Sequence, residues 1–308
     1  MVGHHWHSFR WHWLVVAVAA LAMMIVAALG SVARGQDDPA ELTGNQRAAY
    51  ELIVSWSPKY PDEPRTLHAV PIDGSQPYRL IPGSPDDTFD ETYPDVAPDG
   101  RVIFASGPEG NSDLFVWDGS GAPRNITRSP WNEYGPIWSP DGTQIAFGSR
   151  NADRDIAQIF VINPDGTNRR QLTDRSGGAV SPAWSPDGTR IVFVSIGGQQ
   201  RVDNGWQANT QLWIMDADGS NEQQITTVGP PGVASFEWSP DGQSLIVSGA
   251  TTQIVSMDGR AAVELAPEVS ILGSASWSPD GTVIAVVAPV GDDSRGPTTL
   301  LLVDRNGT

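Results

Sequence analysis

The sequence predicts an all-β fold: a six-bladed β-propeller of four-stranded antiparallel blades, preceded by one N-terminal transmembrane or signal helix. Three observations predict it. A pentapeptide recurs along the chain, and the same succession of β-rich runs follows each copy. The 308 residues also include 32 Gly and 25 Pro, which is typical of a chain with many turns. Repeats of this kind are typical of folds in which small sheets stack side by side.

The first predicted element is an apolar segment over residues 13–32. No charged residue lies between Arg10 and Arg34, and twenty helical residues span about 30 Å, one hydrocarbon core. An uncleaved signal-anchor is the favoured interpretation, and a cleaved signal peptide is the alternative. Both place the rest of the chain outside the cytoplasm. We therefore predict a His- and Trp-rich tail over 1–12, the membrane or signal segment over 13–32, a linker over 33–49 and the propeller over 50–308.

The first propeller unit is predicted from its runs of β-forming residues, since it lacks the pentapeptide. Residues 51–55 and 66–70 are expected to be strands, with Asp73-Gly74 as the turn after the second one. Residues 78–81 are expected to form the outer strand.

The next five units follow the repeat. Trp-Ser-Pro-Asp-Gly begins at four tryptophans, and a degenerate copy covers 96–100; the five Asp positions are 42, 46, 54 and 39 residues apart. A β-rich run follows each copy, at 101–105, 144–147, 190–194, 244–247 and 283–287. After a variable loop, a second run leads to an Asp-Gly or Asn-Gly turn, at 114–117, 159–162, 212–215, 254–256 and 300–303. Five or seven blades stay open, as does an outer strand for the last blade from residues 42–49.

The repeated residues are expected to be structural. Pro restricts φ, Asp bonds nearby backbone amides and Gly supplies a positive φ, so the three together predict a tight turn between strands. The tryptophans are expected to pack between blades. The structural set is Trp138, Asp141, Trp184, Asp187, Trp238, Asp241, Trp277 and Asp280.

These repeats resemble a known family. The segment 138–149, which continues to 159–166 and 170–173, is similar to the WD-like propeller repeat of the TolB type. The resemblance covers roughly residues 50–308 and implies an exported propeller that serves as a binding platform. Fewer than 20 residues separate the apolar segment from the first predicted strand, so the α/β domain that precedes the TolB propeller is not expected here.

Composition excludes several classes of function. Residues 36–308 carry 17 basic and 36 acidic side chains, or −19, which disfavours binding to nucleic acid. The chain has no Cys, so disulfides, thiol nucleophiles and Cys-ligated metals are excluded. The predicted propeller contains one His, His68, expected to be structural, and no nucleophile elbow, metal-protease or nucleotide-binding motif. We predict a protein that is not an enzyme, with no cofactor and no metal site.

Binding residues are expected on one edge of the blades. An antiparallel meander places the Pro-Asp-Gly and Asp-Gly turns on one rim and the long variable loops on the other. These loops are expected at 82–95, 106–113, 128–136, 149–157, 174–182, 196–210, 227–235 and 288–298. Function usually lies on such loops. The candidates are acidic and aromatic: Asp86, Asp87, Asp90, Glu91, Tyr93, Trp131, Glu133, Tyr134, Asp155, Trp206 and Phe236.

The predicted function is a membrane-anchored scaffold outside the cytoplasm that binds a protein or peptide of the cell envelope. The acidic loop 86–95 is a candidate cation site or a docking patch for a basic partner, and a bound divalent cation has no other support in the sequence. The alternative is a carbohydrate-active or metal-dependent enzyme that uses loop carboxylates at the mouth of a central channel. A sensor that holds a small molecule in that channel is a third hypothesis.

Overall fold

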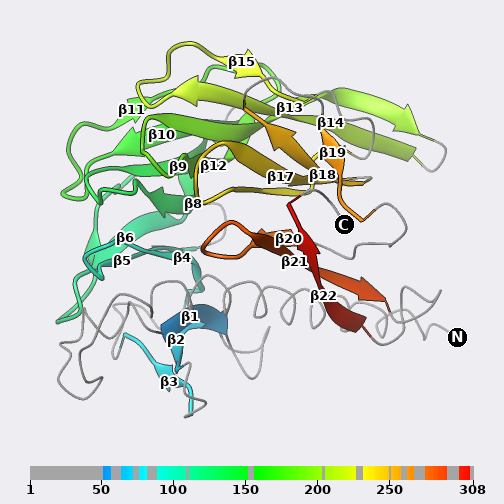
Figure 1. Cartoon of the computed structure of the whole chain (residues 1–308). Coiled ribbons are helices and arrows are strands. Elements are labelled where there is room, and N and C mark those ends of the chain that lie inside the picture. The colour runs from blue at the N-terminus through cyan, green and yellow to red at the C-terminus, as the bar shows by residue number, and fades with distance from the viewer. Residues whose placement is uncertain are drawn as a thin grey trace, which may run out of the picture. The chain divides into compact units, whose positions relative to one another are not determined.

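The computed structural model describes residues 51–56, 64–71, 76–81, 89–108, 111–151, 156–202, 205–226, 232–249, 251–257, 262–266, 275–289 and 298–305. The regular structure of these residues consists of β-strands (Figure 1). The predictions for 1–49, including the segment 13–32 and the extra strand at 42–49, lie outside the described residues. In the described part of the chain, no helix has the length and apolar character needed to cross a bilayer.

Four sheets lie within residues 34–232, which form one compact unit. Blade 1 comprises β1 (Glu51–Trp56), β2 (Thr66–Pro71) and β3 (Tyr78–Arg79). Blade 2 comprises β4 (Glu91–Val96), β5 (Val102–Ser106), β6 (Asp113–Trp117) and β7 (Arg124–Asn125). Blade 3 comprises β8 (Asn132–Trp138), β9 (Ile145–Asn151), β10 (Ile156–Ile162) and β11 (Arg170–Gln171). Blade 4 comprises β12 (Ala179–Trp184), β13 (Arg190–Val202), β14 (Gly205–Asp216) and β15 (Gln223–Gln224).

Two further sheets lie within residues 233–308, in the second compact unit. Blade 5 comprises β16 (Ser235–Trp238), β17 (Ser244–Ser248), β18 (Thr252–Ser256) and β19 (Val263–Glu264). Blade 6 comprises β20 (Ala275–Trp277), β21 (Val283–Pro289) and β22 (Thr298–Asp304). Every pairing is antiparallel and follows chain order. The predicted class, an all-β six-bladed propeller, is confirmed, with three described strands in blades 1 and 6 and four in the others.

The second strand of each repeat forms the core. β17 is buried at all five positions, and β5 is buried at four of five, because both faces of these strands are covered. Phe104, Phe147 and Phe193 occupy the same register position in β5, β9 and β13 and are almost fully buried. The outer strands of blades 1 to 5 are only two residues long, and short edge strands offer little backbone for pairing with another chain.

In blades 4 and 5, hydrogen bonds among the described residues place the two families of tight turns on the same rim, as expected. In blade 4, Ala217 N–H in the Asp-Gly turn donates to the carbonyl oxygen of Thr189, which follows the Pro-Asp-Gly turn, at 2.9 Å. In blade 5, Met257 N–H donates to Gln243 in the same way, also at 2.9 Å. We call this edge of the blades the regular rim and the opposite edge the irregular rim.

The Pro-Asp-Gly turns close through their side chains. Asp141 Oδ1 accepts hydrogen bonds from Ser139 Oγ at 2.6 Å and from Thr143 N–H at 3.0 Å, and Gly142 has a φ of 68°. The same serine–aspartate bond recurs at Asp187, Asp241 and Asp280. These hydrogen bonds, the serine hydroxyl first, hold the pKa of all four carboxyls below the usual range, to about 2 for Asp187 and Asp280. The four aspartates are therefore ionised at neutral pH.

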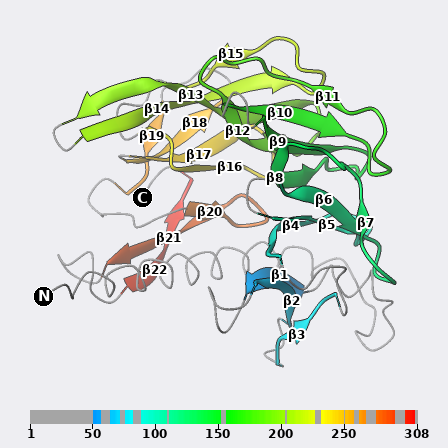
Figure 2. The same ribbon diagram turned by 180° about the vertical axis from the view of Figure 1, so that it is seen from behind.

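One predicted loop is a β-hairpin. The prediction of an irregular loop over 196–210 is wrong, because β13 and β14 stay paired from Arg190 opposite Asp216 to Val202 opposite Gly205. Figures 1 and 2 show β13 and β14 as one long hairpin. A bulge between Ile196 and Gln199 marks the place where the regular blade ends. The segment was predicted as a loop because it contains Gly and polar residues. Such residues can still form a strand when their backbone groups bond to a paired strand.

The inner strands of blades 2, 3 and 4 share a bulge. The register shifts between Thr92 and Asp95 in β4, and at the equivalent places in β8 and β12. Each bulge contains a residue with positive φ followed by proline: Tyr93 (53°), Gly135 (55°) and Ser181 (54°), before Pro94, Pro136 and Pro182. Proline has no N–H and suits a strand that is paired on one side only, as these first strands are within their sheets.

A carboxylate joins neighbouring inner strands. Asp95 Oδ2 accepts a hydrogen bond from Trp138 N–H at 2.7 Å, and Glu237 Oε1 accepts one from Trp277 N–H at 3.3 Å. Burial raises the pKa of both carboxyls, to about 6 for Asp95, although these backbone hydrogen bonds oppose the rise. Each carboxylate stands one residue before the tryptophan position of its own blade.

Candidate functional site

The acidic residues at the start of β4 are bound internally. Asp90 accepts three hydrogen bonds from Arg65, one from the backbone N–H at 2.8 Å and two from the guanidinium at 3.0 and 2.7 Å. Glu91 is 2% exposed, and its Oε2 accepts Leu67 N–H of β2 at 2.7 Å. Ser55 Oγ donates to the carbonyl oxygen of Glu91. Both carboxylates therefore attach β4 to blade 1 and are not arranged around an open cation site.

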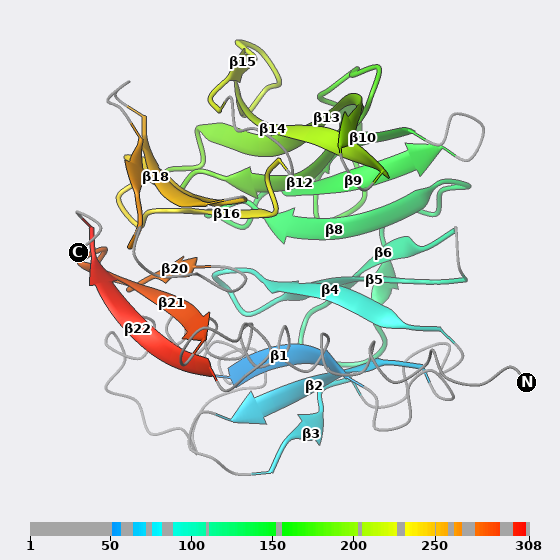
Figure 3. The ribbon, with the colours of Figure 1, turned by 90° about the vertical axis from the view of Figure 1, so that its right-hand side faces the viewer.

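Two predicted aromatic residues lie on neighbouring inner strands and are near enough to interact electrostatically. Figure 3 shows β4 and β8, the strands that carry Tyr93 and Tyr134, running side by side. Tyr93 is 58% exposed. Tyr134 is half-buried, and its ring covers Gly148 so closely that a Cβ there would lie 2.6 Å from ring atoms. Burial raises the pKa of Tyr134 to about 12; the charge of Arg150 opposes the rise, and Tyr93 and Glu133 add to it.

Arg150 completes this group. It pairs with Asn132 across β8 and β9, and its side chain is exposed. Tyrosine and arginine are the residue types that most often dominate protein interfaces. We call Tyr93, Tyr134 and Arg150 the tyrosine site.

Glu133 and Trp131 are held inside blade 3. Glu133 is fully buried, and its Oε1 accepts a hydrogen bond from Arg169 Nη2 at 3.0 Å. Arg169 also donates to Ser149 Oγ at 3.0 Å, and its guanidinium lies 4.9 Å from the ring centre of Phe160 and 5.3 Å from that of Trp131. Burial raises the pKa of Glu133, and the charge of Arg169 opposes the rise. Glu133 and Trp131 therefore contribute to the packing of blade 3 and do not form an exposed binding surface.

A pocket of about 270 Å³ lies on the irregular rim, between the loop that precedes β12 and strands β13, β14 and β15 of blade 4. Arg175 stacks on Trp213 with its guanidinium 3.4 Å from the ring centre, and it pairs with Glu222 at 2.5 Å. Gly177 stands seven residues before Trp184, where blade 3 has Trp131 seven residues before Trp138. Gly177 packs against the backbone of Ile196, since a Cβ would lie 1.9 Å from that carbonyl oxygen. A side chain at this position would collide with Ile196, so blade 4 has no counterpart of Trp131 there.

The remaining predicted residues are separate from the tyrosine site. Asp86, Asp87 and Asp155 lie outside the described residues, as does the side chain of Trp206, whose backbone belongs to β14. Phe236 is half-buried on β16. His68 bonds Thr66 Oγ1 at 3.0 Å, and burial, then Arg79, lowers its pKa. In the part of the chain that is described, no group of three or more His, Asp or Glu side chains could hold a metal ion.

Sequence reasoning missed the arginines that neutralise the carboxylates. Arg65, Arg169 and Arg175 lie 25 to 47 residues from the acids they contact, so no local spacing predicts them. A signal for the bulge was present: a proline stands two residues before the tryptophan position in blades 2, 3 and 4 only. That proline predicts which inner strands bend.

Comparison with known proteins agrees with the repeats. Residues 88–195 match the model of the TolB beta propeller domain family. An uncharacterised protein of Agrobacterium fabrum is 31% identical over 150 residues, which are 47% of this chain and 50% of that protein. The chain thus spans about half the length of this relative.

Two solved structures show the same fold. TolB from Acinetobacter baumannii is 21% identical, over 83% of this chain and 61% of that chain, with a TM-score of 0.58. An oligogalacturonate lyase in complex with manganese is 15% identical, over 86% of this chain and 74% of that chain, with a TM-score of 0.63. At these identities the likeness concerns the fold alone.

Proposed function

We propose that this chain, which carries a TolB-type β-propeller, is a non-catalytic scaffold that binds a protein or peptide through its irregular rim. The TolB-type fold supports a protein-binding role in general terms. The finer proposal is that the tyrosine site is the contact surface and that the propeller lies outside the cytoplasm.

One observation carries the proposal: Tyr93 has a left-handed backbone, with a φ of 53°, and a side chain that is 58% exposed. A bulky residue in this conformation costs on the order of 1–3 kcal/mol, and such strain concentrates at functional sites. Glycine or asparagine would fit the same bulge with less strain. The bulge presents the Tyr93 ring to solvent beside Tyr134, and we infer that a partner contacts this ring.

The state of the carboxylates also supports binding over catalysis. Asp90, Glu91 and Glu133 are the predicted acids whose side chains are described, and each is bound to an arginine or a backbone N–H. Catalytic carboxylates need an open side for substrate, with a raised pKa for the acid and an ionised partner. The enzyme alternative rests on likeness to the oligogalacturonate lyase. Turnover of envelope glycans or of oligogalacturonate, with and without Mn²⁺, tests that alternative, and hydrolysis or elimination of either substrate would overturn the scaffold proposal.

Location is the other part of the proposal. The uncharged segment 13–32 supports export and anchoring at the membrane. Protease treatment of intact spheroplasts should digest the propeller, and carbonate washing should leave the chain in the membrane fraction. A chain that resists protease until the membrane is lysed would contradict the proposed location.

Site-specific cross-linking tests the contact surface. A photoreactive phenylalanine at position 93, in the full-length chain in its own membrane, should give an adduct of discrete mass. Tyr78 is the matched control, because it is also an exposed tyrosine (42%) but lies on β3. Tyr134→Ala should weaken the adduct at position 93 at least fivefold. Equal adducts at positions 93 and 78, or none at position 93, would overturn the tyrosine site as the contact surface.

A further inference from the structure

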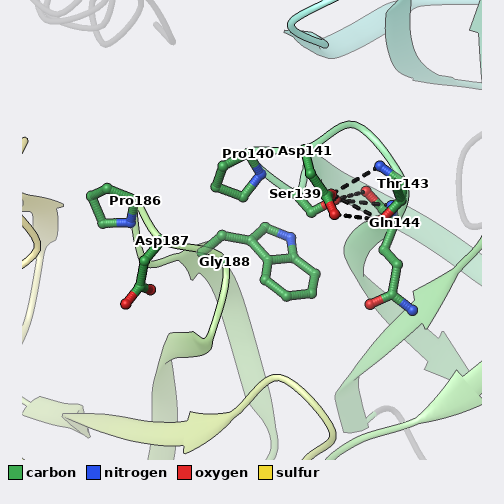
Figure 4. A pocket seen from close by; sticks show the side chains of 9 residues that line it. Ser139, Pro140, Asp141, Thr143, Gln144, Pro186, Asp187 and Gly188 are labelled. Carbon is green, nitrogen blue, oxygen red and sulfur yellow. Dashed lines mark hydrogen bonds between the residues drawn. The ribbon is translucent and has the colours of Figure 1, made fainter.

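A second pocket, of about 310 Å³, lies on the regular rim between blades 3 and 4. The turn after β8 contributes Pro140, Asp141 and Gln144, and the end of β12 with its turn contributes Trp184, Asp187 and Gly188. Figure 4 shows the two turns facing each other across this space. The pocket is on the other rim from the tyrosine site, so nothing that follows depends on that site.

One blade earlier, an arginine fills the equivalent position. The Arg101 guanidinium lies 4.6 Å from the ring centre of Trp138. Its Nε donates to Asp99 Oδ2 at 2.8 Å, and its Nη2 donates to the carbonyl oxygen of Gly142 at 2.9 Å. The guanidinium thus joins the aspartate of one turn to the tryptophan and glycine of the next.

Backbone hydrogen bonds identify which residue of blade 3 corresponds to Arg101. The carbonyl oxygen of Arg101 accepts Ala97 N–H at 2.8 Å, and the carbonyl oxygen of Gln144 accepts Ser139 N–H at 2.9 Å. Ala97 and Ser139 each follow the tryptophan position of their blades. Gln144 therefore stands where blade 2 has Arg101, and it brings no charge.

Blade 6 repeats the arrangement with an arginine from a different element. The Arg305 guanidinium lies 5.8 Å from the ring centre of Trp277, and its Nη2 donates to Asp241 Oδ2 at 3.3 Å. In both cases the cation joins a tryptophan to the aspartate of the preceding turn. Among the residues that the structure describes, no cation lies over Trp184, although Asp141 occupies the same place in the preceding turn.

The pocket is negatively charged and therefore favours a cationic ligand. Asp141 and Asp187 both line it, and hydrogen bonds hold the pKa of each carboxyl below the usual range, so both are ionised at neutral pH. No basic side chain lines the pocket. A guanidinium stacks on an aromatic ring and donates several hydrogen bonds in one plane, whereas an ammonium is more strongly hydrated and stacks less well.

We propose that this pocket binds the side chain of an arginine from a partner polypeptide, in the way that Arg101 sits against Trp138 within the chain. The guanidinium would stack on Trp184 and donate to Asp141 and to the Gly188 carbonyl, the counterparts of Asp99 and Gly142. The regular rim then carries a recognition site of its own for a basic segment.

Titration of the full-length chain in detergent micelles with a capped Gly-Arg-Gly peptide tests this proposal. The readout is the indole N–H signal of Trp184 by NMR, assigned by its loss in Trp184→Phe. The signal should move in a saturable way. The citrulline peptide, which has the same shape but no charge, should bind at least tenfold more weakly, a difference of about 1.4 kcal/mol. The lysine peptide and free arginine should also bind more weakly.

Two variants make the test specific. Gln144→Arg supplies the guanidinium from within the chain and should abolish the response to the peptide. Gln223→Arg makes the same substitution on β15, at an exposed residue outside the pocket, and should leave the response unchanged. Asp141→Asn removes one charge and should weaken binding at least fivefold, which keeps the test decisive if Gln144→Arg does not fold.

Three results would overturn the proposal. They are equal binding of the citrulline and arginine peptides, an unchanged response in both Gln144→Arg and Asp141→Asn, and no movement of the Trp184 signal at any peptide concentration. Equal binding of free arginine would overturn the assignment to a polypeptide partner.

Discussion

The inner strands of blades 2 to 4 differ from those of blades 5 and 6. In β4, β8 and β12 a proline two residues before the tryptophan position follows a residue with positive φ, and the register shifts by one residue. In β16 and β20 the same position holds Phe236 and Ala275, and the described pairing is regular. The pentapeptide is shared, so the difference comes from the residues just before it.

The bulge in a strand changes which side chains are exposed. A bulge turns the side chains before and after it, which is how Tyr93 becomes exposed beside Tyr134. The same blades also contain a buried ion pair, Glu133 with Arg169, whereas Glu237 in blade 5 is bonded by Ser276 and a backbone N–H. The exposed tyrosine and the buried ion pair therefore both lie in the bulged blades.

The largest expected effect is the loss of the buried ion pair. Arg169→Met leaves Glu133 buried without its cation, and we expect a loss of about 3–5 kcal/mol in the free energy of unfolding. The matched control is Arg305→Met in the second unit, whose ion pair with Asp241 is nearly half exposed on both sides and should cost less than about 1 kcal/mol. Urea unfolding of the full-length chain measures both. Equal costs would mean that burial does not distinguish the two regions.

The next effect depends on pH. Asp95 has a folded pKa of about 6, above its unfolded value of about 3.9. The folded state therefore holds an extra proton between these values, and stability falls as the pH rises through that window. Asp95→Asn keeps an acceptor for Trp138 N–H and should gain up to about 3 kcal/mol over the native chain at pH 7, with almost no gain near pH 3.5.

Glu237→Gln tests the equivalent buried carboxylate in blade 5, whose inner strand has no bulge. Burial raises the pKa of Glu237, so this variant should also be relatively more stable at pH 7 than at low pH. Thermal unfolding at several pH values measures both variants. A gain that does not change with pH would show that the carboxylates do not titrate in this window.

A pair of serines tests the bulge itself. Ser181 and Ser235 both stand three residues before a tryptophan, but Ser181 has a φ of 54° and Ser235 lies in a regular strand. Ser181→Gly should stabilise the chain by roughly 0.5–1 kcal/mol, because glycine adopts positive φ without strain. Ser235→Gly should destabilise it by a similar amount. Effects of the same sign in urea unfolding would contradict the difference between the two strands.

The smallest expected effect concerns the acidic loop. Asp90→Asn breaks a partly exposed ion pair with Arg65 and should cost at most about 1 kcal/mol, and less in high salt. The cost should be the same with and without Ca²⁺. Stabilisation of the native chain by Ca²⁺ that Asp90→Asn abolishes would restore the cation site considered for residues 86–95.

Local patterns were enough for the repeating parts of the fold. The period of the pentapeptide, the β-rich runs and the Asp-Gly turns predicted the strands and the rim on which the turns lie, because each depends on residues a few positions apart. The hairpin over β13 and β14 was missed, since its polar and glycine residues resemble a loop. The proline that follows Tyr93, Gly135 and Ser181 in the three bulges is visible in the sequence, but only the observed register shows that the strands bulge there.

The sequence by itself determined the all-β class, the six units and the structural turns, because these follow from local conformational preferences repeated along the chain. Only the tertiary structure decided which acids are neutralised and that no described arginine lies over Trp184, because such contacts join residues of neighbouring sheets. Asp90 with Arg65 and Trp138 with Arg101 are settled by which sheets become neighbours. Packing of neighbouring sheets therefore gives similar repeats different side-chain partners.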